Sequence, residues 1–313
     1  MSLKRKDFLG LYNASKEEIN EILDTAVAMK DILTRTVKKV PTLRGKTVIN
    51  LFYEPSTRTK FSFNLAAKRL SADVMSISKS SSSIAKGESL LDTAKTMEVM
   101  GADVVVIRHS APGAAKFLAK NISASVLNAG DGAHAHPTQA LLDIYSIKER
   151  LGEIAGLKVL IVGDIAHSRV ARSNIWGLNK LGAEVSVAGP QTLIPREIEK
   201  MGVKVYSDLD QALENVDVVN ILRIQMERQE SGLFPSIREY REIYGMNAER
   251  LQMIGEKAVI MHPGPMNRGI EIESSVADSS QSVITEQVKN GVAIRMALLY
   301  LLAGREIDNE KLN

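Results

Sequence analysis

The sequence contains no cysteine among its 313 residues. Disulfide bonds, thiolate nucleophiles and zinc sites with cysteine ligands are therefore excluded, which fits a reducing cytoplasm. The first residues, MSLKRKDFLGLYN, are partly basic but include no apolar core of the kind that a signal peptide needs. The longest apolar stretch near the end, ALLYLLA, is far too short to span a bilayer. We therefore expect a cytoplasmic protein with no membrane partner.

The sequence also lacks a strong excess of one charge. Its 40 Lys and Arg residues nearly balance 37 Asp and Glu residues, and the two kinds are interspersed. Binding to nucleic acid through bulk charge is therefore not expected, although local basic sites for small anions remain open. A hydrophobic fraction of 44% is ordinary for a globular protein, and the length favours two domains.

Short β-branched segments alternate with helical patterns along the chain, as in the strand TVINLF followed by a helix that begins in STRT. This βαβα order predicts an α/β fold of two doubly wound domains, each with a parallel sheet covered on both faces. The pattern restarts near residue 150. We therefore predict domains at 1–150 and 151–280, with a C-terminal helix at about 281–304 that packs back onto the first domain.

Ligands of such sheets bind beyond the carboxyl ends of the strands. The polar residues of interest follow strands or open helices, and they comprise four arginines and one histidine: Arg58, Arg108, Arg169, Arg223 and His136. We therefore expect the active site in the cleft between the two domains.

The stretch YEPSTRTKFSF (53–63) gathers three hydroxyl side chains and an arginine at a predicted helix start. A helix N-terminus offers unpaired N–H groups and partial positive charge, and Arg58 adds a planar donor suited to phosphate. The stretch therefore predicts a phosphate site without the glycine-rich pattern of a P-loop. The alternative is simple capping of the helix by Ser56, with Arg58 on a solvated face.

Two further segments allow a functional and a structural interpretation each. KSSSSIAKGES (79–89) is either an ordinary surface loop or a mobile loop whose Lys86 reaches an anionic ligand.

GAHAHPTQ (132–139) is weak as a metal site because no carboxylate or cysteine supports its histidines. A neutral His136 that donates to a carbonyl group, with Gln139 one helical turn on, is more economical. The alternative is a helix-terminal histidine without chemistry.

VGDIAHSRVARSN (162–174) follows a predicted strand and opens a helix but lacks G-x-G-x-x-G, so a dinucleotide site is not supported. Arg169 points to a carboxylate ligand instead. In LRIQMERQ (222–229), Arg223 and Gln225 lie on one side of an extended segment because side chains alternate there. Structural ion pairs are the alternative for either arginine.

Seven motifs, in order along essentially the whole chain, together resemble the catalytic chains of the aspartate carbamoyltransferase family: FYEPSTRTKFSF, KGES, VIRHS, HAHPTQALLD, GDIAHSRVARSN, LRIQMERQ and HPGPMNRG. The resemblance implies transfer of the carbamoyl group of carbamoyl phosphate to the amine of L-aspartate, in pyrimidine biosynthesis. It implies two α/β domains, one for each substrate, and no metal or organic cofactor. It also implies a homotrimer with shared active sites, to which regulatory chains or another enzyme of the pathway could bind.

The resemblance also assigns roles to residues. The phosphate would be held by Ser56, Thr57, Arg58, Thr59 and Arg108. The carbamoyl carbonyl would be polarised by Thr59, Arg108 and His136. The carbamoyl amide would be fixed by Gln139 and by the backbone at Gly264 and Pro265. The two carboxylates of aspartate would be bound by Arg169, Arg223 and Gln225. Lys86 would come from the neighbouring subunit and touch both substrates, with either Ser82 or Ser83 beside it.

Direct attack by an amine needs no covalent enzyme intermediate, and the departing phosphate is our hypothesis for the proton acceptor.

The nearest alternative to this function is a carbamoyltransferase for another amine such as ornithine. Those enzymes carry a cysteine in an H-C-L-P turn, where this chain has HPGP. A non-catalytic paralogue that binds carbamoyl phosphate is a second alternative, and a dinucleotide-dependent oxidoreductase is a third.

Overall fold

The structure is a computed structural model that describes residues 3–78, 87–224 and 236–304. The chain divides into two compact units. The first consists of Met1–Gly10, Glu17–Thr138 and Gly291–Asn313, and the second of Leu11–Lys16 and Gln139–Asn290. The predicted ranges of the two domains stay a prediction.

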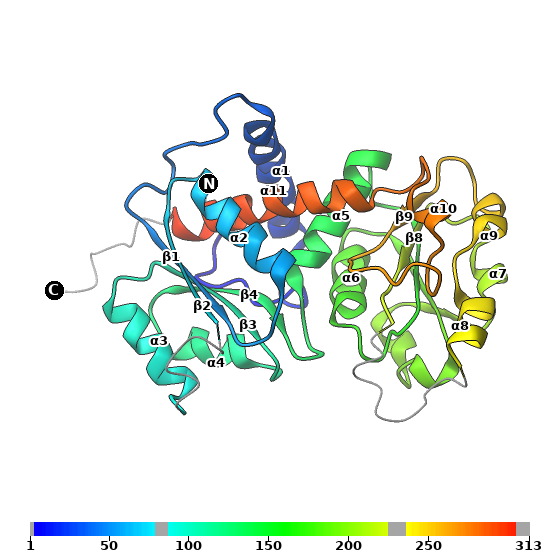
Figure 1. The fold of residues 1–313 in the computed structure, drawn as a ribbon, viewed down its shortest axis with the longest axis horizontal. Coiled ribbons are helices and arrows are strands. Elements are labelled where there is room, and N and C mark those ends of the chain that lie inside the picture. The colour runs from blue at the N-terminus through cyan, green and yellow to red at the C-terminus, as the bar shows by residue number, and fades with distance from the viewer. Residues whose placement is uncertain (1–2, 79–86, 225–235, 305–313) are drawn as a thin grey trace. The chain divides into compact units, whose positions relative to one another are not determined.

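The first unit is built on a four-stranded parallel sheet with the order β2-β1-β3-β4 (Figure 1). Its strands are β1 (Thr47–Phe52), β2 (Asp73–Ser78), β3 (Val104–His109) and β4 (Ser125–Asp131). Its helices include α1 (Lys16–Thr34), α2 (Thr57–Arg69), α3 (Leu90–Val99) and α4 (Ala114–Asn121).

Helices cover both faces of this sheet because neighbouring side chains of a strand point to opposite faces. On one face, Ile49, Leu51 and Val105 pack with apolar residues of α3 and α4. On the other face, Asn50 of β1 donates from its Nδ2 atom to Oδ1 of Asn64 in α2, at 2.6 Å. The strands β1 and β3 are almost fully buried, as expected for central strands of a parallel sheet.

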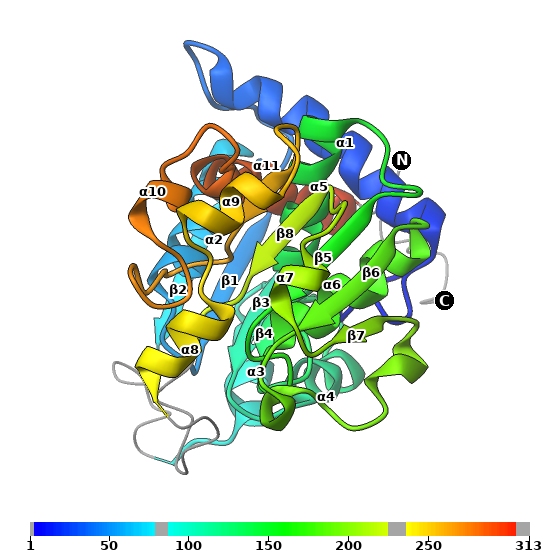
Figure 2. The same cartoon turned by 90° about the vertical axis from the view of Figure 1, so that its right-hand side faces the viewer.

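The second unit contains a five-stranded parallel sheet with the order β7-β6-β5-β8-β9, of which β5 to β8 are labelled in Figure 2 and β9 in Figure 1. Its strands are β5 (Lys158–Val162), β6 (Glu184–Ala188), β7 (Lys204–Tyr206), β8 (Val218–Ile221) and β9 (Val259–Met261). Its helices include α6 (Arg169–Lys180), α7 (Leu209–Ala212), α8 (Ile237–Tyr244), α9 (Ala248–Met253) and α10 (Ser274–Ala277). Two more helices, α5 (Pro137–Leu151) and α11 (Ile284–Ala303), begin and end in different units.

One face of the second sheet packs its apolar residues, such as Leu160 and Val219, against the segments that contain α7, α9 and α10. The opposite face is covered by α5 and α6, where Asn220 of β8 hydrogen-bonds to Asp143 of α5. The nine described strands are therefore all parallel and lie in two separate sheets, which confirms the predicted α/β fold class.

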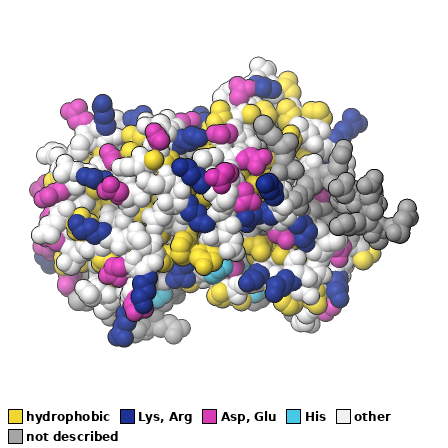
Figure 3. Space-filling view, turned by 180° about the vertical axis from the view of Figure 1, so that it is seen from behind, with side chains coloured by type: hydrophobic (Ala, Val, Ile, Leu, Met, Phe, Trp, Pro, Cys, Tyr) yellow, Lys and Arg dark blue, Asp and Glu magenta, His cyan; other side chains and the backbone are white. Residues whose placement is uncertain are grey.

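The surface carries both charges mixed together. On the face drawn in Figure 3, Lys and Arg side chains are interspersed with Asp and Glu side chains, as the near-balance of charge predicts. Among the helices of the described residues, none is long and apolar enough to cross a membrane.

We expect Gly189→Ala to destabilise the second unit. A Cβ atom at Gly189, directly after β6, would fall against the carbonyl oxygen of Gly163, far inside contact distance. Forcing an atom into a packed site costs about 1–3 kcal/mol, and this backbone oxygen cannot turn aside. The matched control is Gly255→Ala, whose Cβ would meet nothing within 4 Å. Thermal unfolding of both variants tests this expectation, and an equal midpoint for the two would contradict it.

Candidate functional site

The N-terminus of α2 presents the predicted phosphate segment. Ser56 occupies the N-cap position with an extended backbone, but its side chain makes no capping hydrogen bond. The helix therefore begins where the capping interpretation placed it, although the hydroxyl of Ser56 makes no capping hydrogen bond. Thr57 and Arg58 are exposed in the first turn, whereas Thr59 is buried. Exposed donors at the positive end of a 13-residue helix favour an anion.

Arg108 lies near the carboxyl end of β3 and is 9% exposed. Its guanidinium donates to Oε1 of Glu54 at 2.8 Å and to the carbonyl oxygen of Ala129 at 3.2 Å. The Nη1 atom also lies 3.4 Å from Nε2 of His136. Because arginine only donates hydrogen bonds, a hydrogen bond across this contact requires Nε2 of His136 to accept, in the tautomer with its proton on Nδ1. The first unit thus brings Arg108 and His136 together, with Glu54 beside them.

Two arginines lie at one edge of the second sheet. Arg169 is the first residue of α6 and is 5% exposed, and the hydroxyl of Ser168 caps this helix by accepting from the N–H of Ala171 at 3.1 Å. Arg223 follows β8 by two residues and is half-buried. The strands β5 and β8 are neighbours, so the segments that follow them leave the sheet at the same edge.

The turn after β9 contains His262, Gly264 and Pro265. The backbone N–H of Gly264 donates to Nδ1 of His262 at 2.8 Å. Since Nδ1 accepts, Nε2 carries the proton and donates to Oε1 of the buried Glu271 at 3.2 Å. The same oxygen accepts from the N–H of Asn267 at 2.6 Å. These bonds hold the backbone of the turn, in which the Gly264–Pro265 peptide bond is cis.

Gln139 lies in the first turn of α5, where its Nε2 atom donates to Oδ1 of Asp143 at 2.9 Å. Asp143 is 0% exposed. Burial raises the pKa of its carboxyl group from 3.8 to about 6, against the lowering effect of the side-chain amides that donate to it. Gln139 is therefore fixed by a buried carboxylate four residues further along the helix.

The predicted residues fall into three groups. The first unit holds Ser56, Thr57, Arg58, Thr59, Arg108 and His136, and the second unit holds Gln139, Arg169, Arg223, Gly264 and Pro265. Lys86 and Gln225 lie outside the described residues, as do Ser82 and Ser83. The prediction that these residues share one cleft between the domains stays a prediction.

Sequence reasoning missed Glu54 and Asp143. Glu54 sits between β1 and the phosphate segment, so its place beside a strand end was a usable signal. Asp143 lies four residues after Gln139, the spacing that puts two side chains on one helix face. Both signals are weak alone, because their meaning depends on partners elsewhere in the chain.

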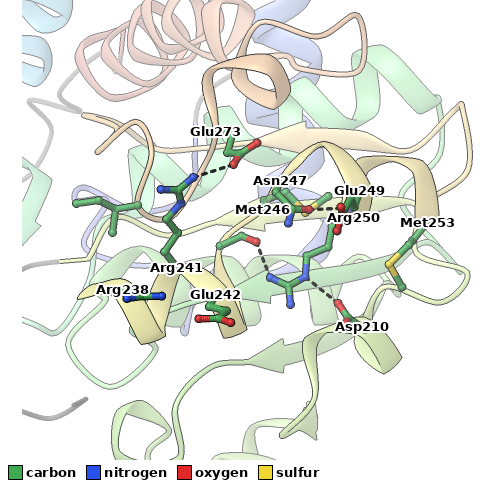
Figure 4. Close-up of a pocket in the computed structure, with 12 residues that line it drawn as sticks. Asp210, Arg238, Arg241, Glu242, Met246, Asn247, Glu249, Arg250, Met253 and Glu273 are labelled. Carbon is green, nitrogen blue, oxygen red and sulfur yellow. Dashed lines mark hydrogen bonds and ion pairs between the residues drawn. The ribbon is translucent and has the colours of Figure 1, made fainter. Parts of the chain in front are cut away.

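The described residues also form a pocket of about 520 Å³ between α8 and α9, and none of its lining residues is a predicted site residue (Figure 4). Its charges are mostly paired with one another: Arg241 with Glu273 at 3.2 Å, and Arg250 with Asp210 at 2.7 Å. This pairing leaves little net charge to attract an ionic ligand. Among the residues that the structure describes, no group of three or more His, Cys, Asp or Glu side chains could hold a metal ion.

Two family descriptions match the chain. The family described as aspartate/ornithine carbamoyltransferase, carbamoyl-P binding domain, matches residues 6–149. The family described as aspartate/ornithine carbamoyltransferase, Asp/Orn binding domain, matches residues 155–302. Together these matches cover most of the sequence.

Individual relatives are similar over their whole length. The aspartate carbamoyltransferase catalytic subunit of Halothermothrix orenii is 80% identical over 312 residues, which cover 100% of each chain. The crystal structure of Trypanosoma cruzi aspartate transcarbamoylase with carbamoyl phosphate and aspartate has a TM-score of 0.86 and 30% identity, over 96% of this chain and 97% of that one. The ornithine carbamoyltransferase of Pyrococcus furiosus has the same TM-score with 31% identity, over 98% and 99% of the two chains.

We expect Glu54→Gln to strengthen the binding of inorganic phosphate by about threefold to tenfold. The change removes a negative charge beside Arg108, and that charge opposes an anion at the neighbouring helix N-terminus. The control is Glu18→Gln, which alters the ion pair with Arg5 elsewhere in the same unit and should leave phosphate affinity unchanged. Titration calorimetry measures both. Weaker phosphate binding by Glu54→Gln would show that Glu54 supports the site rather than competing for Arg108.

Proposed function

This chain belongs to the aspartate/ornithine carbamoyltransferase family, and on that premise we propose that it transfers the carbamoyl group of carbamoyl phosphate to the amino group of L-aspartate. The products are N-carbamoyl-L-aspartate and phosphate, and the reaction belongs to pyrimidine biosynthesis. The resemblance that the seven motifs predicted is confirmed by the 80% identical catalytic subunit.

The contact between Arg108 and His136 carries the proposal. In the tautomer that accepts from Arg108, the imidazole is neutral with a proton on Nδ1, a state suited to donating to a carbonyl oxygen. Thr59 and Arg108 would polarise the same carbonyl. Negative charge develops on that oxygen when an amine attacks, and one fixed donor there is worth about 3–4 kcal/mol. No covalent enzyme intermediate is needed.

Binding of carbamoyl phosphate uses both units in this proposal. Ser56, Thr57, Arg58 and Thr59 hold the phosphate at the positive end of α2, together with Arg108. Gln139 and the backbone at Gly264 and Pro265 hold the carbamoyl amide. Alignment of two bound reactants can supply roughly 7–11 kcal/mol of the barrier, and the departing phosphate takes the proton of the amine.

Aspartate is the preferred amine on charge grounds. It carries two carboxylates, which Arg169 and Arg223 would bind, with Gln225 in support. Ornithine has one carboxylate and a cationic side chain, which these arginines and Lys86 would repel. The turn after β9 reads HPGP and the chain has no cysteine, unlike the ornithine enzymes. The equal TM-score of the ornithine enzyme means that the fold alone does not choose between the amines.

We further propose a homotrimer in which Lys86 enters the site of a neighbouring subunit, with Ser82 or Ser83. The support is the resemblance of the KGES motif, since these residues lie outside the described ranges. Regulatory chains or another pathway enzyme are further partners in this proposal. A cytoplasmic location and the absence of a cofactor stay predictions.

The reaction is tested by amine-dependent consumption of carbamoyl phosphate by the purified chain. We expect carbamoyl-aspartate to form with L-aspartate and no carbamoylated product with L-ornithine. Product with ornithine instead would contradict the two-carboxylate arrangement. Binding of carbamoyl phosphate without turnover of any amine would favour the non-catalytic paralogue.

We expect Arg58→Ala to lower kcat/KM for carbamoyl phosphate by about a hundredfold or more, the loss typical of one donor to developing charge. The control is Lys68→Ala, which removes one positive charge from the exposed last turn of the same helix and should change kcat/KM by less than about twofold. Steady-state kinetics with both substrates varied gives the values. Near-normal turnover by a folded Arg58→Ala variant would refute the phosphate role.

A further inference from the structure

A buried carboxylate in the second unit has neutral hydrogen-bond partners. Asp143 is 0% exposed, and four side-chain amides donate to it from four different elements. Three of the distances are 2.9 Å from Gln139 in α5, 2.8 Å from Asn174 in α6 and 2.7 Å from Gln287 in α11. The fourth donor is Asn220 in β8. No charged group is among the influences on the pKa of Asp143, so these amides alone offset the loss of hydration.

An ionised carboxylate can accept hydrogen bonds but cannot donate them. Each amide around Asp143 therefore turns its NH₂ group toward the carboxylate, and its carbonyl oxygen faces another way. A side-chain amide without such a partner can exchange the positions of oxygen and nitrogen by a half-turn, because the two ends have almost the same shape. Asp143 thus determines which end of each amide is an acceptor for other groups.

For Gln139, this leaves the Oε1 atom as the end that can accept from a ligand. The carbamoyl group of the proposed substrate presents an NH₂ group, which is a donor. An acceptor at Gln139 binds that group, whereas a reversed amide would oppose it with a second NH₂ group and leave both donors unpaired.

The same carboxylate also holds the turn after β9. Gln287 donates from Nε2 to Asp143, so its Oε1 is free to accept from the backbone N–H of His262, at 3.0 Å. That N–H belongs to the first residue of the turn after β9. The backbone of the same turn, at Gly264 and Pro265, is the second proposed contact of the carbamoyl amide. One carboxylate therefore orients both groups that are proposed to recognise this amide.

We propose that Asp143 is a positioning residue for carbamoyl phosphate: through Gln139 and Gln287 it sets the hydrogen-bond polarity that makes the site accept the carbamoyl NH₂ group. This inference rests on the proposed function, because the roles of Gln139 and the turn come from it. Asp143 itself touches no substrate in this scheme. It acts by selecting one of two orientations for each amide.

The test compares two ligands that differ at the carbamoyl nitrogen. Acetyl phosphate has a methyl group where carbamoyl phosphate has NH₂, so it reports binding without that donor. We expect the wild-type chain to bind carbamoyl phosphate at least tenfold more tightly than acetyl phosphate, as measured by calorimetry with freshly prepared ligands above pH 7, where Asp143 is ionised. In Asp143→Leu, which offers no acceptor at this position, this preference should fall to less than about threefold, with little change in affinity for acetyl phosphate or inorganic phosphate.

The control for a general structural effect is Asn174→Ala. It removes one hydrogen bond from the same carboxylate without altering Gln139 or Gln287, so the preference for carbamoyl phosphate should be retained even where thermal stability falls. A merely structural role for Asp143 predicts equal weakening of both ligands in Asp143→Leu. An unchanged preference in that variant, or equal weakening, overturns the proposal.

Rescue by the conservative variant Asp143→Asn tests polarity directly and carries the test if Asp143→Leu does not fold. Gln139 and Gln287 both donate to the same oxygen, Oδ1, so the carbonyl oxygen of an asparagine accepts from both, while Asn174 turns its amide to accept from the new NH₂ group. We expect this variant to keep the preference for carbamoyl phosphate over acetyl phosphate, and a folded Asp143→Asn variant without that preference contradicts the proposal. A wild-type chain that binds the two ligands equally would refute the proposed recognition of the amide itself, a result distinct from failure at Asp143.

Discussion

The parallel course of the strands is the constraint on which the candidate site depends. Every described strand in both sheets runs the same way as its neighbours, so the chain leaves each sheet repeatedly at one edge. In the first unit, this brings Glu54 after β1 beside Arg108 of β3. In the second unit, it places Arg169 after β5 and Arg223 after β8 at a common edge. Residues far apart in sequence can therefore act together only because hydrogen bonds fix the order and direction of the strands.

The buried charged groups of the two units have different kinds of partner. Arg108 is paired with a carboxylate that an incoming phosphate can replace, because both anions suit the same guanidinium donors. Asp143 is instead surrounded by neutral amides that it cannot exchange for a ligand. The first arrangement is ready to respond to an anion, whereas the second holds its shape.

The sequence was sufficient for the fold because the strands are β-branched segments bounded by polar residues, and the predicted strand TVINLF matches β1. The partners of Asp143 could not be predicted, because Gln287 lies 144 residues away and no local pattern joins them. The seven motifs found the candidate residues but not the contacts that orient them.

The overall fold does not distinguish the two amines, because aspartate and ornithine enzymes match this chain with the same TM-score. Arg169 opens α6, so its charge adds to the positive end of that helix, and both favour a carboxylate. An ammonium group at the same place would be repelled by the charge of Arg169 and by the positive end of α6. If Arg169 and Arg223 bind the carboxylates as proposed, a change of amine requires that the segments after β5 and β8 present different charges.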